Sequence, residues 1–298
     1  ITVKPVPPGV NAGSDVTICN GSSTNLNGTP ASTTTTLFSE NFESCGEALI
    51  NPSYCNWQEY IVSGGGDSYS YWAISDNCAL SGSKSLTLWD DRDGNFCDYD
   101  EDGFFSPDIQ FIAYNLTKID ATNYNNLKLN FKWRCYGEWS GSTFYDFGKV
   151  MWSTNGTTWN DFSPATKYYG QTTTQTVSNL DISALNGQQF YLGFYWENDG
   201  SAGGNPPMTV DDVSVTGTPA YTYAWTPTAG LSSATIYNPV ATPTATTTYT
   251  MGVTLNGCTV SDNVDVTVRP TPTASISGTT AVCQGASAPS ITFTNPQT

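Results

Sequence analysis

Phe190-Tyr-Leu-Gly-Phe-Tyr-Trp196 is the stretch that decides the fold class of this chain. Large apolar residues occupy every second position, with tyrosine or glycine between them. The same period of two recurs in Leu127-Lys-Leu-Asn-Phe-Lys-Trp133. This period is typical of β-strands, whose successive side chains point to opposite faces of a sheet, and nothing of helical period persists over three turns. The sequence therefore predicts an all-β fold, with Trp133 and Trp196 in its core.

The two ends of the chain repeat one pattern, which predicts its domain organisation. Thr2-Val-Lys-Pro-Val-Pro7 precedes Cys19-Asn-Gly21, and Thr267-Val-Arg-Pro-Thr-Pro272 precedes Cys283-Gln-Gly285. Between these copies the composition changes: residues 37–217 hold 23 of the 26 acidic residues and 8 of the 9 tryptophans. A repeated unit with a compositionally distinct interior indicates two domains. We expect these segments: the end of a preceding repeat with a linker (1–10), one discontinuous repeat (11–36 plus 219–269), an inserted domain (37–217), and a linker with the start of the next repeat (270–298).

An insertion of this kind has geometric consequences. If residues 37–217 enter at a hairpin of the repeat, the strands near 38–42 and 213–216 should run antiparallel. Cys19 and Cys258 are the only cysteines in the discontinuous repeat. We expect them to form a disulfide between its two sheets, the alternative being two free thiols. The chain is expected to be a fragment of a longer protein.

The charge balance excludes several classes of function. The net charge is −16, with 10 basic residues and no histidine. Because phosphate contacts need clusters of Lys and Arg, we expect neither nucleic-acid binding nor direct membrane insertion. The absence of histidine removes the commonest general base. We therefore expect no enzyme, and the catalytic alternative that remains is a glycosidase with two carboxylates such as Glu138 and Glu197.

Two loops carry candidate binding residues. In Asp98-Tyr-Asp-Glu-Asp-Gly103, the alternating Asp98, Asp100 and Asp102 match the first half of a calcium loop, although Ile109 stands where the final glutamate of such a loop would be. The alternative is a solvated acidic loop. In Gly137-Glu-Trp-Ser-Gly-Ser142, Trp139 could form an exposed aromatic platform for a sugar, with Tyr136 and Tyr145 nearby. The alternative is that Trp139 folds back on the sandwich.

The discontinuous repeat resembles a known family. The residues that carry this resemblance are Asn11-Ala-Gly-Ser-Asp-Val-Thr-Ile-Cys19, Tyr223-Ala-Trp-Thr-Pro227, Thr246-Thr-Thr-Tyr-Thr250 and Asn256-Gly-Cys258. They are similar to the Ig-like or PKD-like repeats of SprB-type gliding-motility adhesins of Bacteroidetes. The resemblance implies a β-sandwich in a tandem array on the cell exterior, exported by type IX secretion, with neighbouring repeats of the same chain as partners.

The inserted domain resembles MAM-like and cleaved-adhesin-like jelly rolls, which are β-sandwiches of adhesion proteins. The matching pieces are Phe38-Ser-Glu-Asn-Phe-Glu43, Cys55-Asn-Trp57, Ser81-Gly-Ser-Lys-Ser-Leu-Thr-Leu88, Ser106-Pro-Asp-Ile109 and Val210-Asp-Asp-Val-Ser-Val215. The resemblance implies a disulfide between Cys45 and Cys55. It implies a structural calcium ion held by Glu43, Asp76, and Asp211 or Asp212. The pairing of Cys78, Cys97 and Cys135 departs from the family pattern and stays open.

Together, these features predict a jelly-roll domain inserted in a hairpin of an Ig-like repeat, within a fragment of a large secreted, cell-surface adhesin. Calcium is the expected cofactor, and surface glycans or polysaccharide are the expected partners, in a role in gliding motility. The alternative is that the inserted domain is a structural spacer of a surface filament and binds no ligand. An open cleft rimmed by aromatic and amide side chains would favour binding, and a sealed apolar surface would favour the spacer.

Overall fold

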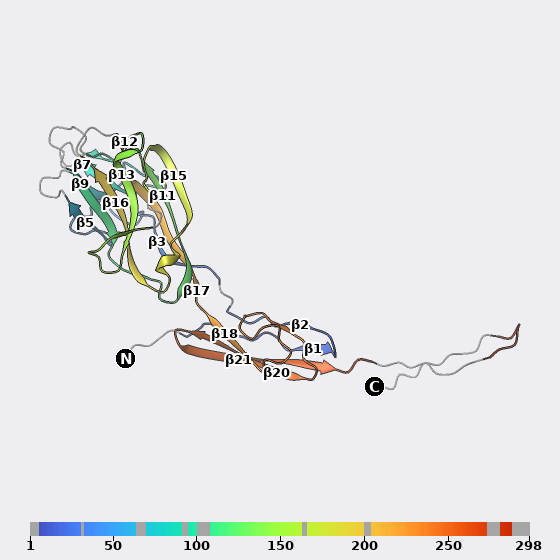
Figure 1. Ribbon diagram of the computed structural model, residues 1–298. Coiled ribbons are helices and arrows are strands. Elements are labelled where there is room, and N and C mark those ends of the chain that lie inside the picture. Colours follow the sequence, from blue (N-terminus) through green and yellow to red (C-terminus); the bar gives the residue numbers. More distant parts are fainter. Residues whose placement is uncertain are drawn as a thin grey trace. The chain divides into compact units, whose positions relative to one another are not determined.

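The computed structural model describes residues 6–30, 33–63, 70–90, 95–99, 108–162, 166–199, 204–272 and 281–287. The chain divides into two compact units: unit 1 comprises Ile1–Ala31 and Tyr221–Thr298, and unit 2 comprises Ser32–Ala220. Apart from the single turn η1 (Ser183–Leu185), every element in the described ranges is a β-strand, so the fold is all-β (Figure 1). No helix within these ranges has the length and apolar character that a membrane span needs.

Unit 1 is built on a four-stranded sheet and a two-stranded sheet in the described residues. The larger sheet has the order β1 (Val16–Cys19), β21 (Cys258–Arg269), β20 (Thr247–Leu255) and β18 (Thr222–Thr226). The smaller sheet pairs β19 (Val240–Ala241) with β2 (Thr24–Asn25). Tyr249, Met251 and Val253 alternate along β20 and are fully buried, so one face of this sheet forms the core of unit 1.

The expected disulfide between Cys19 and Cys258 is wrong, because both thiols are free. The register of the sheet explains this. Strand β1 runs parallel to β21 and places Cys19 opposite Arg269, the last residue of β21, whereas Cys258 is its first residue. Eleven steps of about 3.3 Å put the two ends of β21 roughly 36 Å apart, and a disulfide needs Cα atoms within about 7 Å.

Unit 2 is a sandwich of two antiparallel sheets, whose strands lie side by side in Figure 1. Within the described residues, sheet A has seven strands: β12 (Glu138–Ser140), β13 (Thr143–Ser153), β16 (Gln189–Asn198), β9 (Ile109–Asn115) and β5 (Trp57–Ser63) in that order, with β10 (Ile119–Asp120) paired to β16 and β14 (Asn160–Asp161) to β13. Sheet B has eight: β15 (Gln171–Asp181), β11 (Tyr124–Cys135), β17 (Thr209–Pro219), β7 (Ser85–Asp90), β6 (Ser70–Ser75) and β4 (Ala48–Leu49) in that order, with β3 (Thr35–Glu40) paired to β17 and β8 (Asn95–Phe96) to β7.

The core of unit 2 lies between these sheets. Phe131 of β11 packs edge-on against Phe194 of β16 at 5.4 Å between ring centroids, and Trp196 is fully buried as predicted. Trp133 is half-buried and packs against this core. The antiparallel pairing predicted for the first and last strands of this domain is confirmed, since β3 and β17 pair antiparallel. The role of unit 1 as a discontinuous Ig-like repeat stays a prediction.

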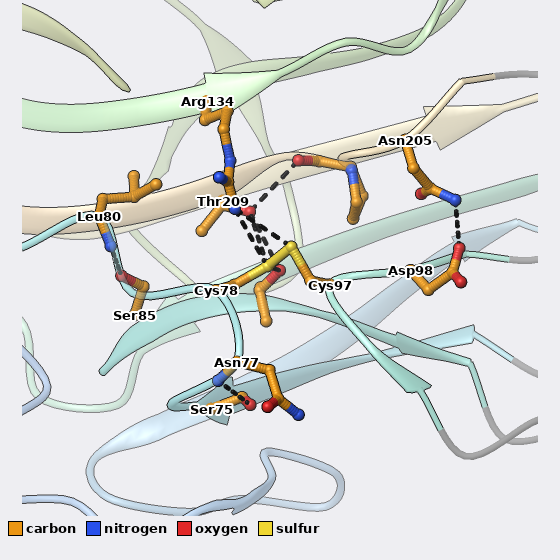
Figure 2. The surroundings of a disulfide bond; sticks show 12 residues. Ser75, Asn77, Cys78, Leu80, Ser85, Cys97, Asp98, Arg134, Asn205 and Thr209 are labelled. Atoms are coloured by element: carbon orange, nitrogen blue, oxygen red, sulfur yellow. Dashed lines mark hydrogen bonds between the residues drawn. A yellow bond between two sulfur atoms is a disulfide. The ribbon is translucent and has the colours of Figure 1, made fainter. Parts of the chain in front are cut away.

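Two disulfides tie unit 2 together. Cys45–Cys55 is the pair that the family resemblance implied, and Cys78–Cys97 resolves the pairing that the sequence left open, with Cys135 free and buried. Figure 2 shows the Arg134 guanidinium pointing at the second disulfide from β11, where one Nη donates to both sulfur atoms at 3.4 and 3.2 Å. Disulfides of this kind are typical of proteins exported to oxidising environments.

Replacing both Cys78 and Cys97 with serine should destabilise unit 2. The bond closes a loop with a sequence separation of 19, for which the chain-entropy model gives about 3 kcal/mol. Urea unfolding followed by tryptophan fluorescence measures the change. The matched control is Cys19→Ser, a free and exposed thiol, which should leave the unfolding curve unchanged. Equal stability of the double variant and the parent would contradict the assignment.

One carboxyl group is buried between the two sheets. Glu59 of β5 accepts a hydrogen bond from the backbone N–H of Trp72 in β6 at 2.8 Å and another from the Asn51 amide at 3.3 Å. Burial raises the pKa of Glu59 to about 7, and these two hydrogen bonds offset only part of that rise. A carboxyl whose folded-state pKa is raised favours folding at low pH, and this contribution is lost as the pH rises through about 7.

Glu59→Gln should therefore make the stability of unit 2 less dependent on pH. The variant should gain on the parent as the pH rises from about 4.5 to about 7, by an amount on the order of 3 kcal/mol, because the amide carries no charge to bury. Urea unfolding at pH 4.5 and pH 8 gives the two differences. A constant difference between variant and parent across this range would show that Glu59 does not titrate there.

Candidate functional site

The outward face of sheet A carries aromatic residues where a solvated sheet would carry polar ones. On β16, Tyr191, Gly193 and Tyr195 alternate with the residues that face the core between the sheets, and Tyr195 is itself buried in a second cluster on this other face. The register of the sheet aligns Tyr195 with Ile112 of β9 and Lys149 of β13, and Ile112 with Tyr60 of β5. Because side chains directly opposite in antiparallel strands lie about 5 Å apart, these four residues form one row across four strands.

Trp159, in the segment before β14, covers the neighbouring row. A Cβ atom at Gly193 would lie 2.8 Å from the Trp159 ring and 2.6 Å from Ile112 Cγ2, so glycine leaves the space that this indole occupies. The Trp159 ring packs edge-on against Tyr114 at 5.1 Å and lies 6.2 Å from Tyr60. The Tyr60 hydroxyl donates to the Thr157 carbonyl at 3.1 Å, which anchors the segment that presents the indole.

A pocket of about 260 Å³ opens between these side chains. The side chains that line it include Tyr60, Gln110, Ile112, Lys149, Trp159 and Tyr195. The Trp159 Nε1–H is buried and has no hydrogen-bond partner in the described part of the chain. Aromatic walls with a few convergent polar groups are characteristic of small-ligand sites. This size is slightly below the roughly 300–1,000 Å³ typical for drug-sized ligands, and it suits a single ring.

The predicted platform residues Tyr136 and Trp139 lie together at another part of unit 2. Their rings are edge-on at 5.3 Å and remain 38% and 36% exposed, so Trp139 does not fold back completely. The Trp139 ring also packs against the Tyr169 ring at 5.4 Å between centroids, and the Tyr169 ring packs against Phe144 at 4.5 Å. Phe144 and Tyr169 also pack against the buried cluster beneath the pocket, which joins the two aromatic groups into one band.

The third predicted platform residue, Tyr145, is half-buried on β13. The tyrosines of the pocket and Trp159 were not predicted from the sequence as a site. The signal that could have found them is the aromatic character of Tyr191 and Tyr195, which occupy the positions facing away from the core.

Three carboxylates converge at the β12–β13 end of sheet A. Within the described residues, one oxygen each of Glu138, Asp146 and Asp199 lies within 4.8 Å of the others, which makes this a possible metal-binding cluster. The buried Asp146 accepts hydrogen bonds from the Tyr99 hydroxyl at 2.7 Å and the Asp199 N–H at 3.1 Å. Burial, together with the charges of Asp199 and Glu138, raises the pKa of Asp146 to about 6.

The structure does not gather the calcium ligands that the family resemblance implied. Glu43 accepts hydrogen bonds from the Ser83 N–H and hydroxyl at 2.7 and 2.5 Å, and the Ser83 hydroxyl is the main reason for its lowered pKa. Asp211 is buried and accepts from Ser81 N–H at 2.9 Å. Donors of the 81–85 turn occupy these oxygens, so the carboxylates anchor that turn, and the calcium ion that the resemblance implies there stays a prediction.

The remaining predicted ligands lie elsewhere. Asp212 forms an ion pair with Lys132 at 2.7 Å, and Asp76 is exposed. Asp98 accepts hydrogen bonds from the Tyr99 N–H and the Asn205 amide. Asp100 and Asp102 lie outside the described residues. Tyr99, the residue after Asp98, therefore connects Asp98 to the cluster of Glu138, Asp146 and Asp199, because its hydroxyl donates to Asp146.

No family model matches the sequence, and no curated protein matches it. Among solved structures, the chain has distant counterparts. The chain is similar to TmCBM61 in complex with β-1,4-galactotriose (12% identity, 59% of this chain and 92% of that chain, TM-score 0.31). It is also similar to the CBM22-1 xylan-binding domain of Xyn10C from Paenibacillus barcinonensis (12% identity, 64% and 98%, TM-score 0.34) and to TmCBM27, a mannan-recognising carbohydrate-binding module (10% identity, 62% and 98%, TM-score 0.32).

Proposed function

We propose that unit 2 binds carbohydrate on the outward face of sheet A and performs no catalysis. The observation that carries this proposal is the pocket walled by Tyr60, Trp159 and Tyr195. Aromatic rings offer flat apolar surfaces on which the C–H face of a sugar can pack, and tyrosine and tryptophan add a polar edge. Gln110 provides hydrogen-bonding groups for sugar hydroxyls in the same pocket.

The open pocket favours binding over the alternative of a ligand-free spacer. A spacer has no use for an indole held over a glycine at the edge of an open pocket. The carboxylates of this face also argue for binding without catalysis. Glu197 accepts a hydrogen bond from the Tyr195 hydroxyl at 2.6 Å, and Asp161 forms a looser ion pair with Lys149 at 3.6 Å.

The wider setting of this binding domain rests on the sequence resemblance. In our proposal the chain is part of a secreted cell-surface adhesin of the SprB type, acting in gliding motility. Its Ig-like repeats form the stalk, and the inserted domain holds surface polysaccharide. The two disulfides of unit 2 agree with an extracellular location.

Trp159→Ala should weaken glycan binding at least tenfold, because buried tryptophans at the centre of an interface contribute most to affinity. A glycan array with the 298-residue chain selects the ligand, and calorimetry measures the dissociation constant. Trp89→Ala is the matched control, since this indole is half-buried on β7 of sheet B. Equal losses in both variants, or no retained glycan on the array, would refute the proposed function.

Calcium is the ion that we propose for the cluster of Glu138, Asp146 and Asp199. The donors are all carboxylate oxygens, which a hard cation prefers, and the chain has no histidine. A cation at this position would offset the charge of the buried Asp146, whose ionised form is otherwise unfavourable.

Removing calcium with a chelator should lower the melting temperature of unit 2. A ligand at a hundredfold excess over Kd stabilises by about 2.7 kcal/mol, or roughly 5–10 °C for a domain of this size. Asp199→Asn should abolish the calcium-dependent increment. Glu43→Gln should lower the melting temperature but keep that increment, because Glu43 anchors the 81–85 turn. If neither calcium nor chelator changes the melting temperature, the calcium site is ruled out.

A further inference from the structure

Two ammonium groups meet over one ring on the proposed binding face. Lys149 Nζ lies 5.5 Å from the Phe147 ring centroid, and Lys167 Nζ lies 3.7 Å from the same centroid. Lys149 also lies over Tyr195 at 4.9 Å, and Lys167 over Phe144 at 4.9 Å. Both cations therefore sit within the aromatic band, beside the pocket that Lys149 helps to line.

This concentration of positive charge is unusual for the chain. Residues 37–217 contain 23 acidic and 8 basic side chains, yet two of those basic residues converge on Phe147. Like charges at one ring repel, and desolvation further disfavours the Lys167 ammonium, whose pKa is lowered mainly by burial. An arrangement with these costs suits an anion that binds between the two groups.

The ammonium groups keep capacity for such an anion. Lys149 lies 3.6 Å from the nearest Asp161 oxygen, which is longer than a hydrogen bond. Lys167 has no ion pair with any carboxylate in the described part of the chain. The other acidic group on this face, Glu197, is engaged by the Tyr195 hydroxyl at 2.6 Å. A carboxylate arriving near Phe147 would thus meet two donors that lack hydrogen-bonded anionic partners.

We propose that the pocket takes a uronic acid unit of an acidic polysaccharide, with its ring against Tyr60 and Trp159 and its carboxylate toward Lys149 and Lys167. This inference rests on the proposed function and names its substrate class. A uronic acid joins a sugar ring, which the aromatic walls can hold, to one carboxylate at the edge of that ring. A neutral sugar would fill the same walls but would add no anion beside the two ammonium groups, for which Asp161, 3.6 Å from Lys149, is the only ion-pair partner in the described part of the chain.

The test compares acidic polysaccharides with their own neutral counterparts. Oligosaccharides of polygalacturonate, alginate and hyaluronan are each paired with a version whose carboxyl groups are reduced to primary alcohols. Binding is measured by calorimetry with the 298-residue chain at 0.15 M salt. At this concentration the Debye length is about 8 Å, so the salt screens the repulsion between the ligand and the net charge of −16. At least one acidic member should bind ten times more tightly than its reduced counterpart.

Variants locate the effect. Lys149→Gln and Lys167→Gln should each weaken binding of that acidic ligand about tenfold and leave binding of its reduced counterpart unchanged, because a charge-assisted hydrogen bond is lost. Lys149→Arg keeps the charge and should keep most of the preference. Lys128→Gln, on β11 of sheet B, removes the same charge and should leave the affinity for both the acidic and the reduced ligand unchanged. Thermal melting confirms that each variant is folded.

The outcomes separate this inference from the proposed function. If reduced and acidic ligands bind equally, or if Lys128→Gln matches Lys149→Gln, the uronic acid assignment is overturned while carbohydrate binding stands. If no glycan of either kind binds, the proposed function fails, and this inference fails with it.

Discussion

The pairing of β16 between β9 and β13 is the constraint on which both faces of sheet A depend. Residues 193–197 of this central strand each have a fixed neighbour on β9 and on β13, so one register decides which side chains face the core between the sheets and which face away from it. Phe194 enters the core between the sheets with Val150 and Ala113 beside it, and Tyr195 lies on the opposite face with Lys149 and Ile112 beside it, in the second buried cluster. A shift of one residue would exchange the two sets, and the large buried aromatic area makes that shift unfavourable.

The sequence was sufficient for features that depend on local pattern. Alternation along 127–133 and 190–196 predicted strands and the burial of Trp196, and the resemblance to jelly rolls correctly implied the Cys45–Cys55 disulfide. It failed for Cys19 and Cys258, which were paired by elimination. The pairing was inferred because these two cysteines share a domain. The distance between them, however, is set by the parallel register of β1 on β21, and no local sequence pattern encodes that register.

The proposed binding face was missed for the same physical reason. Tyr60, Tyr114 and Trp159 come from separate segments, and they become neighbours only through the order of strands in the sheet. In the sequence, Gly193 is one of the residues that alternate with the large apolar ones, and the structure shows that its missing side chain makes room for the Trp159 indole. Trp139, by contrast, stood out because its exposure follows from a local Gly/Ser loop.

The acidic cluster and the aromatic band share their supporting strands, which gives a bound ion a direct mechanical connection to the binding face. Glu138 immediately precedes Trp139 in β12, and Asp146 immediately precedes Phe147 in β13. Without a cation, three carboxylates within 4.8 Å repel one another. This repulsion acts on β12 and β13, the two strands that carry these rings. A cation that draws them together would hold Trp139 and Phe147 in place, and Phe147 is the ring that carries both lysines. In our proposal, calcium therefore fixes the geometry of the proposed glycan platform, and direct contact with the sugar is not required for this role.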